Sequence, residues 1–78
     1  MKLSRHVKNN IRLYKIAEKD IIETIELPDS AHREGNKLIA IKKFQKKFSG
    51  YPLKVTYEKI GAEIKIITAY PLKKEHWR

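Results

Sequence analysis

The sequence predicts an α+β fold in which two N-terminal helices are followed by a three- or four-stranded antiparallel sheet. Apolar side chains recur at helical spacing over residues 4–14, and a second apolar segment with acidic side chains ends at Pro28. From Lys37 onward the apolar side chains alternate with a period of two, which is typical of strands. Because 78 residues leave room for only one domain, we expect residues 1–78 to fold as a single unit.

The first predicted helix, residues 4–14, has one apolar and one basic face. Ser4 is a favourable N-cap residue for it. With about 100° of rotation per residue, His6 and Asn10 fall on the border between the two faces. The apolar face is formed by Leu3, Val7, Ile11 and Tyr14, and the basic face by Arg5, Lys8, Arg12 and Lys15. The basic face is either a ridge that binds polyanions or a solvated surface with no further role.

A second helix is predicted from Glu18 to Leu27, and Pro28 ends it because proline cannot continue a helix. Its early acidic residues complement the positive end of the helix dipole. The predicted buried side chains are Ile21, Ile22 and Ile25, and the predicted exposed ones are Asp20, Glu23 and Glu26. We expect this acidic face not to contact phosphate groups.

The period-two alternation predicts strands within residues 37–42, 53–58 and 63–70, with a hairpin turn at residues 59–62. A short strand over residues 31–34 that turns at Gly35-Asn36 would supply the fourth strand. In the last strand, the side chains predicted to share one face are Ile64, Ile66, Thr68 and Tyr70.

The composition favours a polyanionic partner and excludes several kinds of site. A net charge of +9 predicts attraction to RNA, DNA, anionic lipid or an acidic protein. The lack of cysteine excludes disulfides, thiolate nucleophiles and cysteine-based zinc sites. The three histidines lie on separate predicted elements, so we expect no metal site and no cofactor. Because there is neither a signal peptide nor an apolar run of roughly 20 residues, we expect a cytoplasmic protein without a membrane partner.

Lysines and aromatic residues are interleaved around residues 42–51. Lysines can neutralise phosphates, and exposed aromatic rings can stack on bases. The lysines are Lys42, Lys43, Lys46 and Lys47, and the aromatic residues are Phe44, Phe48 and Tyr51. These lysines and the side chains of Arg5, Lys8 and Arg12 form the predicted nucleic-acid-binding set. The alternative is that Phe44 and Phe48 belong to the core and the lysines only solubilise a loop.

Several segments along nearly the whole chain together form a pattern found in a known family. They are Ser4-Arg5-His6, Ile16, Asp20-Ile21-Ile22, Pro28, Val55-x-Tyr57, Ile64-x-Ile66-Ile67-Thr68-Ala69-Tyr70-Pro71 and Trp77. In these segments the chain resembles a small bacterial and archaeal domain family of unknown function. That family is similar to the BrnT toxins and, more remotely, to the RelE/barnase-like ribonuclease superfamily. The chain departs from it at Tyr14-Lys15, where members often have Arg-Gly, and Arg12 lies two residues earlier.

The resemblance implies a RelE-like fold, a metal-independent endoribonuclease and, as in a toxin–antitoxin pair, an antitoxin protein as partner. Because RNA supplies its own 2′-hydroxyl nucleophile, such an enzyme needs proton-transfer groups and fixed positive charge. Imidazole exchanges protons near neutral pH, which makes His6 the candidate base or acid. Thr68 and Tyr70 are candidates for hydrogen bonds to the scissile phosphate, and Lys54 or Arg12 for countering its charge.

Each candidate also has a structural interpretation. His6 would then be a packed helix residue, Thr68 an ordinary β-branched strand residue and Tyr70 a partly buried aromatic residue. For the whole protein the leading hypothesis is a RelE-like toxin that cleaves RNA. The alternatives are a non-catalytic RNA- or DNA-binding module and a protein-interaction domain whose lysines serve solubility.

Overall fold

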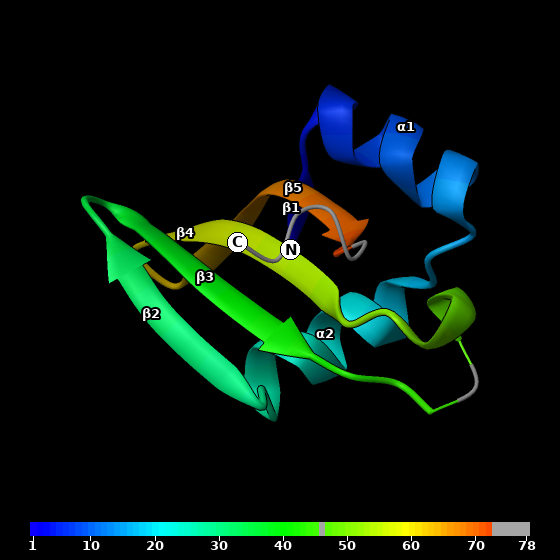
Figure 1. Ribbon diagram of the computed structural model, residues 1–78. Coiled ribbons are helices and arrows are strands. Elements are labelled where there is room, and N and C mark those ends of the chain that lie inside the picture. The colour runs from blue at the N-terminus through cyan, green and yellow to red at the C-terminus, as the bar shows by residue number, and fades with distance from the viewer. Residues whose placement is uncertain (46, 73–78) are drawn as a thin grey trace.

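The chain forms two helices and five strands in the computed structural model, which describes residues 1–45 and 47–72 (Figure 1). The elements are β1 (Lys2–Leu3), α1 (Arg5–Tyr14), α2 (Glu18–Glu26), β2 (Ser30–Glu34), β3 (Lys37–Lys42), the short 3₁₀ helix η1 (Phe48–Gly50), β4 (Leu53–Ile60) and β5 (Glu63–Pro71). Both predicted helices and all four strands predicted after residue 30 are confirmed. Within the described ranges, no helix is long and apolar enough to cross a membrane. Trp77, which carries part of the resemblance, lies outside them.

The sheet is mixed, and its strand order is β1-β5-β4-β3-β2. β1 pairs in parallel with β5, whereas the other neighbouring strands are antiparallel. The prediction of a three- or four-stranded antiparallel, RelE-like sheet that follows both helices is therefore wrong. Lys2 and Leu3 give no strand signal, because two residues are too few to show an alternation. Their partners, Lys65 and Ile66, lie near the other end of the chain, so no local pattern links them.

A β-bulge at Ile67 divides β5 into two halves. Consecutive residues of β4 pair with Ile66 and Thr68, so Ile67 has no partner across this pair of strands. One extra residue reverses the alternation of side chains beyond it. Ile64 and Ile66 therefore lie on the face that packs against the helices, and Thr68 and Tyr70 lie on the other face. The prediction that these four side chains share a face is wrong, because it extrapolated the period of two through the bulge.

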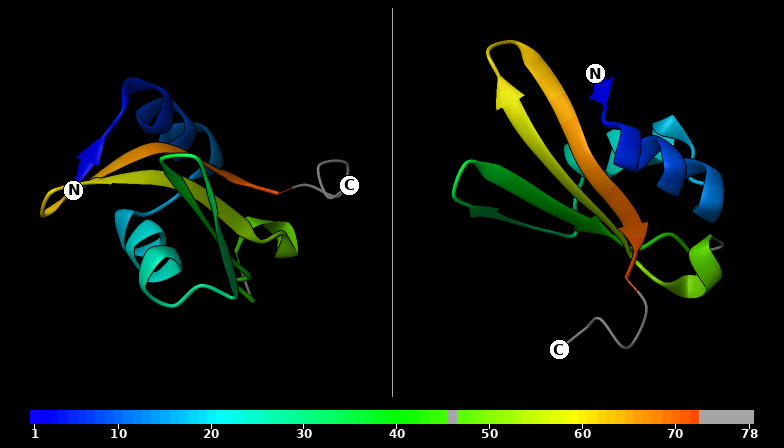
Figure 2. Two further views of the ribbon diagram at one scale, coloured as in Figure 1. Left: turned by 90° about the vertical axis from the view of Figure 1, so that its left-hand side faces the viewer. Right: turned by 90° about the horizontal axis from the view of Figure 1, so that it is seen from above.

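α1 lies along the part of the β5 edge that β1 leaves uncovered. As predicted, Ser4 caps this helix: its hydroxyl accepts a hydrogen bond from the N–H of Val7 at 3.1 Å. The same hydroxyl donates to the carbonyl of Ile67 at 2.7 Å, and the side-chain amide of Asn10 donates to the carbonyl of Ala69 at 3.2 Å. In the left panel of Figure 2, α1 lies above the hairpin of β4 and β5 and α2 lies below it. α1 thus covers the second half of β5 at this edge of the sheet.

A single core joins both helices to one face of the sheet. In α2 the predicted pattern of buried and exposed side chains is wrong at two positions. Ile22 is 43% exposed, whereas Asp20, predicted on the outer acidic face, is only 3% exposed. The apolar pattern does not reveal this, because Asp20 turns inward toward polar partners. The buried core side chains are Val7, Ile16, Ile21, Ala40, Leu53, Val55, Tyr57, Ile66 and Ala69.

Candidate nucleic-acid interface

Three of the four predicted catalytic side chains come together on the outer face of the sheet, opposite the core. Lys54 and Tyr70 are direct cross-strand partners, and Lys54 Nζ lies 5.8 Å from the centre of the Tyr70 ring. Thr68 pairs with Thr56 in the adjacent row. An ammonium group over an aromatic ring is attracted to its π face. The positive charge and the ring are therefore held side by side, with two hydroxyl groups next to them.

These two rows continue across β3 and β2. One row contains His32, Ile39, Thr56 and Thr68, and the next contains Ser30, Ile41, Lys54 and Tyr70. We call these eight residues the outer-face set. His32 and Thr56 were not among the site residues predicted from the sequence. The turn at Gly35-Asn36 could have predicted the position of His32 opposite Ile39, because a short hairpin loop fixes the register of its strands.

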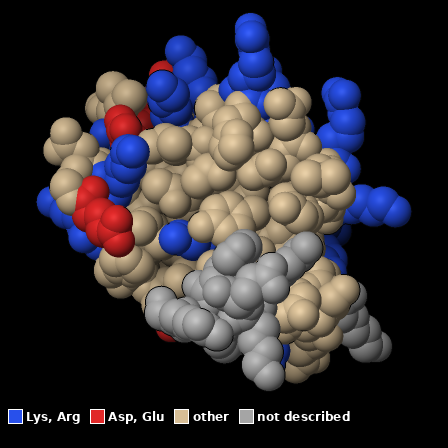
Figure 3. All heavy atoms as spheres, turned by 45° about the horizontal axis from the view of Figure 1, so that its top comes forward, with Lys and Arg blue, Asp and Glu red and all other residues tan. Residues whose placement is uncertain are grey.

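The outer-face set combines buried and solvent-accessible side chains. Ile39 is 4% exposed and Thr56 is 9% exposed, whereas Lys54, Thr68 and Tyr70 are half-buried. In Figure 1, β3 and β4 lie in front of α2, so this face is turned toward the viewer. Figure 3 views the molecule obliquely from the top and shows lysine and arginine side chains at the upper and right-hand margins, acidic beside basic side chains at the left, and mostly uncharged residues between them.

The predicted basic ridge is present on α1. Its apolar side packs on the core, and its basic side chains are exposed. His6 is also exposed and lies one helical turn before Asn10, outside the outer-face set. Because α1 follows the half of β5 that holds Thr68 and Tyr70, the ridge lies at the same edge of the sheet as these two residues. The exposed basic side chains of the ridge are Arg5, Lys8 and Arg12.

The predicted lysines of residues 42–47 differ in what they contact. Lys42 Nζ donates a hydrogen bond to the carbonyl of Leu27 at 3.0 Å, just beyond α2. The side chain of Lys43 is exposed, and Lys46 lies outside the described residues. This segment therefore does not present four equivalent cations to a ligand.

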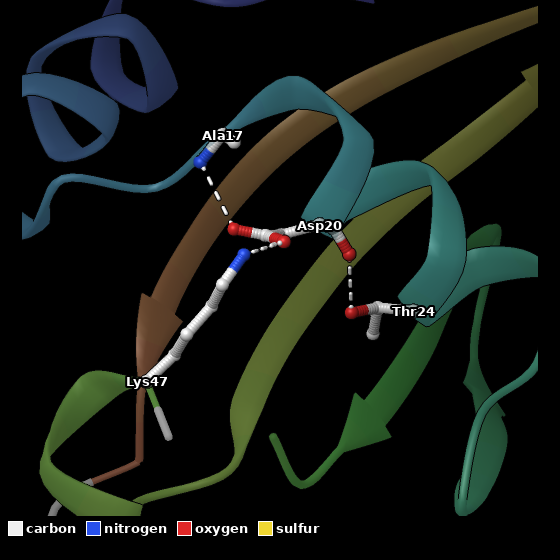
Figure 4. A network of polar contacts seen from close by, with 4 residues as sticks. All are labelled: Ala17, Asp20, Thr24 and Lys47. Atoms are coloured by element: carbon white, nitrogen blue, oxygen red, sulfur yellow. Dashed lines mark hydrogen bonds and ion pairs between the residues drawn. The ribbon is translucent and has the colours of Figure 1, made fainter. Parts of the chain in front are cut away.

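Lys47 takes part in a structural network with Asp20 (Figure 4). Lys47 Nζ lies 2.7 Å from one carboxylate oxygen of Asp20, whose side chain is 4% exposed. The other carboxylate oxygen accepts a hydrogen bond from the N–H of Ala17 at 3.2 Å, and the Thr24 hydroxyl donates to the Asp20 carbonyl at 2.7 Å. The network joins the start of α2 to the segment before η1, so Lys47 contributes to folding.

Removing the Asp20 carboxylate should cost about 2 kcal/mol of unfolding free energy. Breaking a buried ion pair costs roughly 3–5 kcal/mol, but Lys47 is 43% exposed, which reduces the effect. Urea denaturation of Asp20→Ala and Lys47→Met would measure it. The control is Lys43→Met, whose exposed side chain should contribute less than about 0.5 kcal/mol. If Asp20→Ala were as stable as the control, the network would have no stabilising role.

Phe44 and Phe48 belong to the packed part of the molecule. Their rings meet edge to face with centroids 5.7 Å apart, and both pack against the core. Lys47 Nζ also lies 5.9 Å from the centre of the Phe44 ring. The alternative in which these two rings are core residues therefore fits the structure better than that of exposed rings that stack on bases.

The described residues contain no group of three or more histidine, aspartate or glutamate side chains placed to hold a metal ion. The outer-face set contains hydroxyl, aromatic and cationic groups beside two isoleucine side chains. Such groups can hydrogen-bond and neutralise a phosphate and stack on a base. Comparison with known protein families, with characterised proteins and with solved structures found no match, so the resemblance to the BrnT and RelE-like families stays a prediction.

Proposed function

We propose that the protein binds single-stranded RNA across the outer face of its sheet, while the basic ridge of α1 contacts the phosphate backbone. The observation that carries this proposal is the pairing of Lys54 with Tyr70 beside Thr56 and Thr68. A nucleotide presents a flat base and a charged phosphate, and an adjacent ring and ammonium group match both. The net charge of +9 supplies the long-range attraction.

The position of the set favours a single strand over a duplex. Proteins read the major groove of a duplex with a projecting helix or a two-stranded ribbon. The outer-face set instead spans β5, β4, β3 and β2 in two rows, which gives a broad surface for unstacked bases. The half-buried Thr68 hydroxyl can also pair with a ribose 2′-hydroxyl, the group that distinguishes RNA from DNA.

Removing the Tyr70 ring should lower the affinity for a single-stranded RNA oligonucleotide by about tenfold. Stacking one base on an aromatic side chain contributes roughly 1–3 kcal/mol, and about 1.4 kcal/mol is a factor of ten. Fluorescence anisotropy on Tyr70→Leu would measure this change, with circular dichroism to confirm folding. Tyr51→Leu is the matched control, because Tyr51 lies outside the outer-face set. Equal affinities of the two variants would argue against the outer face as the binding surface.

Metal-independent cleavage of RNA is a second candidate function, as the resemblance to BrnT and RelE-like toxins implies. The observation in its favour is that Lys54, Thr68 and Tyr70 lie together. The sequence pattern does not reveal this arrangement, because it gives no sign of the bulge at Ile67. Attack by the 2′-hydroxyl would leave cyclic-phosphate and 5′-hydroxyl ends. Incubation of wild-type protein with labelled RNA in EDTA, followed by analysis of the ends, tests this candidate. A co-purifying small protein that blocks cleavage would be the implied antitoxin.

A further inference from the structure

The two edges of the sheet differ in how far other elements of the described chain cover them. At one edge, the short strand β1 pairs with the first half of β5, and α1 and its N-cap bond to the carbonyls of Ile67 and Ala69 in the second half. The opposite edge is β2, and all five of its residues, Ser30–Glu34, are exposed. In Figure 1, no other element of the described chain lies along the outer side of β2.

β2 lacks several of the usual devices that keep an edge strand from pairing. Proteins protect such edges with proline, with bulges or with an element laid over them. Ser30–Glu34 contains no proline, and its register with β3 runs without a shift over five pairs. Its outward N–H and C=O groups therefore form a regular template for one more strand.

We propose that β2 pairs antiparallel with β2 of a second copy of this chain. The register that uses the full strand has His32 opposite its own copy. It places Ser30 opposite Glu34, and Ala31 opposite Arg33, so no two fixed like charges face each other. Like charges directly opposite destabilise a pair of strands, and this register avoids them. The strand can thus pair with its own copy without like charges directly opposite each other.

The distribution of charge supports a second copy in spite of the net charge of +9. The strand order places β2 at the edge farthest from β5 and α1, which carries the basic ridge. Pairing through β2 therefore keeps the two ridges at opposite ends of the joined sheet. At the edge itself, Arg33 and Glu34 nearly cancel each other.

Pairing through β2 would also affect RNA binding, an inference that rests on the proposed function. Antiparallel continuation of a sheet has its two-fold axis perpendicular to the sheet. Both outer faces then lie on the same side, next to each other, with a basic ridge at each end. The dimer would offer two adjacent outer-face sets to one RNA strand. An oligonucleotide long enough to reach both should bind more tightly than a short one, through the raised effective concentration at the second site.

Self-association is tested without RNA, so that its outcome is independent of RNA binding. Sedimentation equilibrium should show a reversible dimer of the 9.2 kDa chain below about 1 mM. Ala31→Lys places a lysine opposite Arg33 of the partner subunit at two symmetric positions. It should weaken the dimer by about tenfold, at roughly 0.2–1 kcal/mol for each pair. Ala31→Lys combined with Arg33→Glu should restore it. A monomer at all concentrations, or no effect of the lysine, would overturn the proposal.

The register is tested by cross-linking, since the chain contains no cysteine of its own. Residues directly opposite in an antiparallel pair have Cβ atoms about 4.5–5.5 Å apart, within reach of a disulfide after small adjustment. His32→Cys should therefore form a covalent dimer under mild oxidation much faster than Ser30→Cys, whose opposite residue is Glu34 of the partner subunit. Equal rates would refute the register. A dimer that passes both tests but binds no RNA would leave this inference standing and refute the proposed function.

Discussion

Neutralising the basic ridge of α1 should weaken the binding of single-stranded RNA by roughly 10²- to 10³-fold at about 50 mM salt. The variant combines Arg5→Gln, Lys8→Gln and Arg12→Gln, whose side chains are all exposed. Each phosphate that is no longer neutralised should reduce the slope of log affinity against log salt by about 0.7 for a single strand. Three such phosphates reduce the slope by about 2, which gives the predicted weakening at this salt concentration.

The matched control removes the same charge elsewhere. Lys19→Gln, Lys37→Gln and Lys59→Gln change exposed lysines in α2, at the start of β3 and near the end of β4. Anisotropy titrations at four or more salt concentrations would give both slopes. If the two triple variants lose affinity equally, binding depends only on net charge, and a specific role for the ridge is ruled out. Lys47 is unsuitable for such a series, because its ion pair with Asp20 would mix a loss of folding with a loss of binding.

The helices and antiparallel strands were predictable because their signals are local. Ser4 stands at the N-cap position and bonds to Val7, and the turn at Gly35-Asn36 connects β2 to β3 as expected. β1 was not predictable in this way, because it is a strand only by virtue of its pairing with distant residues of β5. The inward position of Asp20 likewise depends on Lys47, which is remote in sequence and looks like an ordinary loop lysine.

Lys54, Thr68 and Tyr70 of the outer-face set were predicted as site residues from the sequence, but their arrangement was not. Lys54 and Tyr70 are partners only because the bulge at Ile67 shifts the register of β5 by one residue. Without the shift, the alternation that buries Ile66 would also turn Tyr70 inward. Ser4 bonds to the carbonyl of Ile67, so the N-cap of α1 and the bulge stabilise each other. The N-cap residue Ser4 and the bulge at Ile67, which are remote in sequence, thus jointly determine how the outer-face set is arranged. No local sequence pattern reveals this arrangement.

If the protein cleaves RNA, His6→Ala should lower the single-turnover rate by roughly 10²-fold or more and leave RNA affinity nearly unchanged. His6 is exposed in the first turn of α1, and no acidic side chain in that turn would repel a phosphate. Asn9→Ala is the matched control, because Asn9 is an exposed polar neighbour on the same helix. Rates are compared for each preparation per folded molecule, with the melting temperature measured on the same samples.

Thr68→Val separates the contribution of the sheet from that of the helix, because valine keeps the branched shape of the strand residue while removing its hydroxyl. A slower rate in both His6→Ala and Thr68→Val would mean that helix and sheet act on one phosphate. Normal cleavage by His6→Ala would retain the enzyme and discard this histidine as its proton-transfer group. A wild-type protein that binds RNA in a salt-dependent way and never cuts it would leave the binding module as the function. The exposed position of His6, outside the outer-face set, would then reflect no more than a solvated helix surface.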